Sequence, residues 1–89
     1  MEPVFYIKEV GFITIGYILI NVKKNHKKEV LEALSHTSDV VDVYPIYGDY
    51  DIIAKITAKS FAGLGKVIVR KILSIDSVLA TKTYTAENT

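Results

Sequence analysis

Cysteine is absent from the 89-residue sequence, which excludes disulfide scaffolds, cysteine-rich zinc modules and cysteine nucleophiles. An excess of one charge is also lacking, because 11 basic side chains against 10 acidic ones leave a net charge of +1. The chain therefore has no global field that would attract nucleic acid or an acidic membrane.

Long apolar runs are missing as well. The longest, residues 10–20, is interrupted by two glycines and a threonine, and it falls short of the roughly 18 residues that a transmembrane helix needs. Glu2 and Glu9 offset Lys8 ahead of this run, and no small-residue cleavage site follows it, so a signal peptide is not expected. We expect a cytoplasmic protein.

The hydrophobic content is high for so short a chain. Hydrophobic residues make up 49% of the sequence and charged residues 24%, which is typical of a folded protein, and the mean hydropathy is +0.25. The length suffices for one domain only. A domain of this size hides about 60% of the surface of its unfolded chain, so apolar surface is expected to remain exposed and to promote self-association.

The first half of the chain predicts a strand, a helix and a second strand. Tyr17 to Val22 is short and β-branched, and Asn25 is a plausible N-cap for a helix from His26 to Ser35. Val40 to Tyr47 alternates in polarity, and Pro45 in it is tolerable at an edge or a bulge. The apolar stripe of the predicted helix consists of Val30, Leu31 and Leu34.

The second half repeats this order. Gly48 and Asp49 predict a turn into a strand from Asp51 to Thr57, Ser60 predicts a helix start, and Val78 to Thr85 predicts a closing strand. The residues expected on one face of the second helix are Phe61, Leu64, Val67, Ile68 and Ile72.

The order strand, helix, strand, strand, helix, strand predicts an α+β fold of the ferredoxin-like, split βαβ type (βαββαβ). Right-handed crossovers place both helices on one face of a four-stranded antiparallel sheet. The other face lacks a cover, and alternation gives apolar side chains to both faces, with Tyr44 and Ile46 on one and Val41 and Val43 on the other. A homodimer through the open face is therefore expected; the alternative is that Pro3 to Ile15 folds over part of it.

Residues 1–15 are expected to form an N-terminal extension, as an added strand or a dimer arm, because β-forming side chains are frequent there. Residues 16–89 are expected to form the domain itself.

Candidate catalytic and metal-binding residues are scarce. His26 and His36 are ten positions apart, which is not the spacing that brings two ligands to one metal. Neither lies in a nucleophile motif, a phosphate-binding loop is missing, and the single arginine, Arg70, lies in the second helix. We therefore predict no catalytic residue, no metal and no cofactor.

The basic run from Lys23 to Lys28 is either a solvated loop or a site for an acidic partner. The absence of aromatic residues from the third strand, Asp51 to Thr57, disfavours RNA recognition.

The turn from Tyr47 to Asp51 is the most informative local feature. Its glycine permits a positive φ, and Asp49 and Asp51 would either hold an ammonium group or bond to backbone N–H groups of the turn. Thr81 and Thr83 share one face of the last strand, as ligand-binding hydroxyls or simply as good strand formers.

Four segments together resemble one family: Tyr17-Ile18-Leu19-Ile20-Asn21-Val22, Val40-Val41-Asp42-Val43-Tyr44, Gly48-Asp49-Tyr50-Asp51 and Ser77-Val78-Leu79-Ala80-Thr81-Lys82-Thr83. They are similar to the effector-binding domain of the Lrp/AsnC transcriptional regulators, called the regulation of amino acid metabolism (RAM) domain. The sequence departs from the family pattern at Lys24-Asn25, where Pro-Gly is typical, and at Ser77, where glycine is typical. Only Met1 to Ile15 precede the resemblance, so it implies a RAM domain without its own helix-turn-helix.

The resemblance implies a dimeric α/β barrel, assembly into higher oligomers, and an amino acid effector bound between subunits. It implies DNA-binding Lrp/AsnC homologues as partners, with no direct contact to nucleic acid or membrane. Two alternatives stay open, an assembly or adaptor domain without a ligand and a small enzyme on a dimeric ferredoxin-like scaffold. The ligand-binding residues implied by position are Gly48, Asp49, Tyr50 and Asp51 in the turn and Thr81 and Thr83 in the last strand.

Overall fold

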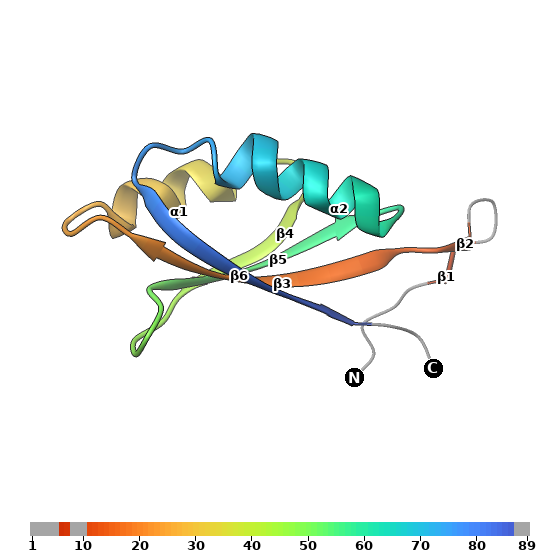
Figure 1. The fold of residues 1–89 in the computed structure, drawn as a ribbon, viewed down its shortest axis with the longest axis horizontal. Coiled ribbons are helices and arrows are strands. Elements are labelled where there is room, and N and C mark those ends of the chain that lie inside the picture. Colours follow the sequence, from red (N-terminus) through yellow and green to blue (C-terminus); the bar gives the residue numbers. More distant parts are fainter. Residues whose placement is uncertain (1–5, 8–10, 87–89) are drawn as a thin grey trace.

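A computed structural model describes residues 6–7 and 11–86 (Figure 1). Its main elements are β3 (Thr14–Val22), α1 (Lys27–Ser35), β4 (Val40–Pro45), β5 (Ile52–Ala58), α2 (Phe61–Val67), the π-helical continuation η1 (Ile68–Ile72) and β6 (Val78–Ala86). Two short strands, β1 (Tyr6–Ile7) and β2 (Gly11–Phe12), pair with each other.

One antiparallel sheet carries the fold, with strand order β4-β5-β3-β6. Both helices cover the same face of this sheet, and no element between α1 and β6 covers the other (Figure 1). The ferredoxin-like, split βαβ fold is therefore confirmed. In the described part of the chain, neither helix is both long enough and apolar enough to span a membrane.

Most of the predicted N-terminal extension, residues 1–15, lies outside the described residues. Thr14 and Ile15 are part of β3, and Ile15 is fully buried. The assignment of the extension as a strand or a dimer arm stays a prediction.

The core lies between the sheet and the helices. Alternation along β3 and β5 sends every second side chain toward the helices, and the buried positions from Gly16 to Val22 and from Ile52 to Ile56 follow this period of two. Ile15 is buried outside this alternation and does not belong to the cluster between sheet and helices. The buried cluster consists of Ile18, Ile20, Val22, Val30, Leu34, Ile52, Ala54, Ile56, Leu64 and Ile72.

The predicted face of the second helix is only partly correct. Leu64 and Ile72 are buried, but 55% of the surface of Phe61 is exposed. In η1 the N–H of Leu73 donates to the carbonyl of Ile68 at 2.8 Å, five residues back, and this wider turn brings Leu64 and Ile72 onto one face of the helix. Phe61, three positions before Leu64, is rotated by about 60° from that face.

The first helix begins differently from the prediction. Asn25 is not the N-cap: it lies in the preceding turn with φ 69°, a left-handed conformation that asparagine tolerates. His26 takes the N-cap position without a side-chain cap, and its Nδ1 is 2.8 Å from the carbonyl oxygen of Lys24, which accepts the hydrogen bond. The cap predicted for the second helix is confirmed, because the Ser60 hydroxyl accepts from the N–H of Gly63 at 3.0 Å.

The prediction that Val41 and Val43 lie on the same face of the sheet is wrong, because β4 contains a bulge. Val40 pairs with Ile56 but Asp42 pairs with Lys55, so Val41 is the extra residue. Val43 packs against the core, whereas Val41 is half exposed and does not share its face.

Asp51 fixes one end of the sheet. Its Oδ2 accepts from the backbone N–H of Val22 at 2.9 Å, and its own N–H donates to the carbonyl of Ile20 at 2.9 Å. The pairing of β3 with β6 shifts register between Asn21 and Val22, and the carboxylate satisfies an amide at this irregularity. This aspartate is thus engaged by the fold itself.

We predict opposite effects for two glycine substitutions. A Cβ at Gly16 would lie 2.9 Å from Cδ2 of the buried Leu64, whereas a Cβ at Gly65 would meet nothing within 4 Å. Gly16→Val should destabilise the protein by about 1–3 kcal/mol through overpacking, and Gly65→Ala should stabilise it by about 0.5–1 kcal/mol because glycine is a poor helix former. Urea unfolding measures both, and if the clash is the cause, Gly16→Val combined with Leu64→Ala should destabilise the protein by less than the sum of the two single changes.

A second prediction separates the two aspartates of the turn. Asp51→Ala should lower the free energy of unfolding by about 1–2 kcal/mol because it leaves the Val22 amide without its acceptor. Asp49→Ala, at an exposed position, should change it by less than about 0.5 kcal/mol. Equal losses for the two variants, measured by chemical denaturation, would contradict the bracing role of Asp51.

Candidate ligand-binding site

The turn between β4 and β5 is closed at its base. The N–H of Ile46 donates to the carbonyl of Asp51 at 2.8 Å, so residues 47–50 form a short excursion from the sheet. Gly48 has φ +136°, a conformation that L side chains rarely adopt, which explains the glycine at this position. Gly48 and Asp49 are exposed and Tyr50 is half buried.

A lysine from the first helix holds the other side of this turn. Nζ of Lys27 donates to the carbonyl oxygen of Ile46 at 2.7 Å and lies 4.2 Å from the centre of the Tyr47 ring. From the sequence alone, Lys27 is recognised only as one residue of a basic run. Its contact with the Ile46 carbonyl could not be predicted, because the two residues are 19 positions apart in the chain. Together with the bond from Asp51 to Val22, this contact ties the turn to α1 and to β3.

The two threonines lie on the helix side of the sheet. Thr81 pairs with Ile20 and Thr83 with Ile18, and both isoleucines face the core. Within one chain β3 separates β6 from β5, and no hydrogen bond joins either threonine to the turn in the described residues. Gly48, Asp49, Tyr50 and Asp51 are adjacent in space, whereas Thr81 and Thr83 are not brought to them within this subunit.

Lys82, between the two threonines, points to the opposite, open face. Its ammonium group lies 5.5 Å from the centre of the Tyr84 ring. A hydrogen bond and the charge of Tyr84, with a smaller effect of Tyr50, raise the pKa of Lys82 above its ordinary value.

The open face itself carries a shallow hollow of about 150 Å³. Its lining comes from β3, β4 and β5, with Tyr44 opposite Ile53 and Asp42 opposite Lys55 across the strands. Tyr44 is 59% exposed. Sequence reasoning identified the open face but not this hollow, because the bulge at Val41 decides which side chains of β4 face it.

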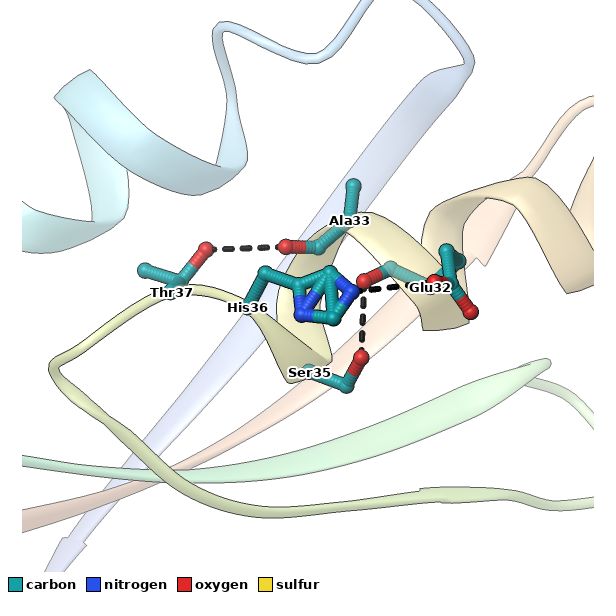
Figure 2. A network of polar contacts seen from close by, with 5 residues as sticks. All are labelled: Glu32, Ala33, Ser35, His36 and Thr37. Atoms are coloured by element: carbon teal, nitrogen blue, oxygen red, sulfur yellow. Dashed lines mark hydrogen bonds and ion pairs between the residues drawn. The ribbon is translucent and has the colours of Figure 1, made fainter.

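The end of α1 is stabilised locally (Figure 2). Nε2 of His36 is 3.0 Å from Oε2 of Glu32, and the hydroxyls of Ser35 and Thr37 donate to the carbonyls of Glu32 and Ala33. These contacts satisfy groups at a helix terminus. Across residues 6–7 and 11–86, no three His, Cys, Asp or Glu residues are grouped to hold a metal ion.

The turn exposes polar and aromatic groups. The turn offers an exposed carboxylate at Asp49, and backbone N–H groups lie beside it. Aromatic rings at Tyr47 and Tyr50 offer apolar contact with a polar tip.

Known proteins resemble this chain in sequence. The transcriptional regulator FL11 of Pyrococcus furiosus is 34% identical over 74 residues, which are 83% of this chain and 48% of the relative. The regulator Ptr1 of Methanocaldococcus jannaschii is 27% identical over 75 residues, 84% of this chain and 51% of the relative. Both are named as helix-turn-helix-type regulators, and the chain spans about half the length of each.

Solved structures resemble it in fold. AsnC of E. coli superposes with a TM-score of 0.80 at 26% identity, over 85% of this chain and 52% of AsnC. The TTHA0845 protein of Thermus thermophilus superposes with a TM-score of 0.80 at 29% identity, over 85% of this chain and 95% of that protein. Residues 15–89 match the family model described as the Lrp/AsnC ligand binding domain. Since this match covers most of the sequence, the chain belongs to the Lrp/AsnC family and carries its ligand-binding domain.

Proposed function

We propose that the protein is an oligomeric sensing module of the cytoplasm that binds an amino acid and transmits binding through its assembly. The observation that carries this proposal is the turn of residues 47–50, which is tied to β3 by Asp51 and to α1 by Lys27 in a family ligand-binding domain. A turn held from two sides presents its groups to a ligand at a low entropic cost.

The chemistry of the turn fits the two charged groups of an amino acid. The exposed carboxylate of Asp49 complements an α-ammonium group, and backbone N–H groups near Gly48 complement an α-carboxylate. Thr81 and Thr83 would contribute hydroxyls from another subunit, since they lie away from the turn within one chain. A Neisseria meningitidis transcriptional regulator of the same fold is described as a complex with L-methionine, at a TM-score of 0.77 and 12% identity, so methionine belongs among the first ligands tested.

Assembly through the open sheet face would cover the exposed aromatic side chains there. Tyr44 and Tyr84 are each at least half exposed, and the hollow lined by Tyr17, Ile53 and their neighbours gives a second copy a place to insert a side chain. Burying such apolar surface favours association. Mixed assembly with DNA-binding Lrp/AsnC homologues is the proposed route to transcription.

A second candidate function is an assembly domain that binds no effector. The engagement of Asp51 with the Val22 amide favours it, because one of the two carboxylates of the turn already has a structural role. The two candidates differ in whether a free amino acid stabilises the protein.

Thermal unfolding with each of the twenty amino acids tests the proposal. A ligand at 100 times its dissociation constant stabilises the native state by about 2.7 kcal/mol, which raises the Tm of a domain of this size by roughly 10 °C or more. We expect such a shift for one amino acid or a small group of similar ones, and expect Asp49→Ala to remove most of it. A Tm indifferent to all twenty would favour the assembly domain without an effector.

Two matched substitutions test the open face. Tyr44 and Val69 are 59% and 60% exposed, but Tyr44 lies on the open face of the sheet and Val69 on the helix layer. Tyr44→Glu should raise the dissociation constant of the dimer at least about tenfold, because it places a charge in an apolar interface. Val69→Glu should leave it unchanged. Analytical ultracentrifugation measures both, and a dimer unaffected by Tyr44→Glu but broken by Val69→Glu would assign the interface to the helices instead.

A further inference from the structure

Lys27 is placed where a lysine is locally unfavourable. It is the first residue of α1, and a positive charge in the first turn of a helix opposes the helix dipole by a few tenths of a kcal/mol. Its neighbour Lys28 is exposed, and its side chain makes no hydrogen bond, ion pair or ring contact within the described residues. Lys27 instead extends its ammonium group to the turn and donates to the Ile46 carbonyl at 2.7 Å.

On the side that faces α1, packing contributes little to the position of the turn. Tyr47 is 93% exposed, so packing against the core does not fix its position. The Lys27 ammonium lies 4.2 Å from the centre of its ring, within the range of a cation–π contact. The same ammonium therefore contacts two consecutive residues, the last before the turn and the first within it.

The hydrogen bond is also well suited to this task. The donor is charged and the contact is partly buried, two conditions under which a hydrogen bond is stronger than a neutral, solvated one. On the opposite side, Asp51 is fixed by β3. Lys27 is thus the counterpart of Asp51, and the residues between the two anchors are those that the proposed ligand would contact.

We propose that Lys27 is a positioning residue for the ligand-binding turn: it holds residues 47–50 in the conformation that receives the ligand and joins that turn to the start of α1. This inference rests on the proposed function for the identity of the ligand. The positioning itself is a property of the unliganded protein. Because the link runs from the turn to α1, a ligand that moves the turn also changes the contacts at the start of this helix.

Three variants test the proposal. Lys27→Met keeps the length and apolar stem of the side chain but removes the charge and the donor, Lys27→Arg keeps both, and Lys28→Met is the control for loss of a first-turn lysine. Two NMR measurements are made without ligand: backbone ¹⁵N order parameters of Gly48, Asp49 and Tyr50, and hydrogen exchange of the Ile46 amide, which closes the turn.

In Lys27→Met we expect the order parameters of the turn to fall to those of a flexible loop, below about 0.6, and exchange of the Ile46 amide to accelerate roughly tenfold. Exchange of the core amides of Ile18 and Ile20 should stay within about twofold. Lys27→Arg should restore both readouts, and Lys28→Met should behave like the unmodified protein.

Binding is then measured by calorimetry with the amino acid that gives the largest Tm shift. Lys27→Met should weaken binding at least about fivefold, since part of the binding energy would then order the turn, and Lys27→Arg should recover it. A turn that stays as ordered in Lys27→Met as in the parent overturns the inference, and so does a loss of order spread equally over the core amides. If the parent protein binds no amino acid, the proposed function fails, and the order parameters alone still decide whether Lys27 positions the turn.

Discussion

The constraint on which the structure depends is that the two faces of one sheet lie in different environments: one packs against the helices, and the other is uncovered within the subunit. β3 and β5 lie in its centre, and every second side chain of each faces the helices. The alternate side chains, Tyr17 and Ile53 among them, face away from the helices and line the hollow. In an isolated subunit the apolar side chains on the uncovered side stay in contact with water, which is unfavourable. The same alternation that builds the core therefore also creates the surface through which we propose the protein assembles.

Much of the fold was predictable because it follows from short-range patterns. The β-branched strands and the apolar stripe of the first helix gave the element order, and the element order with right-handed crossovers gave the sheet topology. The cap at Ser60 was predictable for the same reason, since a serine hydroxyl acts within three residues of its own position.

The features that were missed depend on long-range contacts or on single-residue irregularities. The bulge at Val41 and the wide turn of η1 each change the face on which later side chains lie, and neither has a distinct sequence signal. In the candidate site, the positive φ of the turn was predictable from its glycine, Gly48. The carboxylate of Asp51 and the ammonium of Lys27 act on backbone groups 29 and 19 positions away, which only the folded chain brings within reach.

These two contacts connect the candidate site to the rest of the domain. A turn anchored to a central strand and to a helix cannot shift without changing contacts in both, so the binding that we propose at the turn would be physically linked to the packing of the subunit. The most direct test of this account is the mass in solution by light scattering over a range of protein concentrations, with and without the amino acid that stabilises the protein. The account predicts an oligomer whose dissociation shifts to a different concentration range when the ligand is added. A protein that stays monomeric at micromolar concentration in both conditions would contradict it.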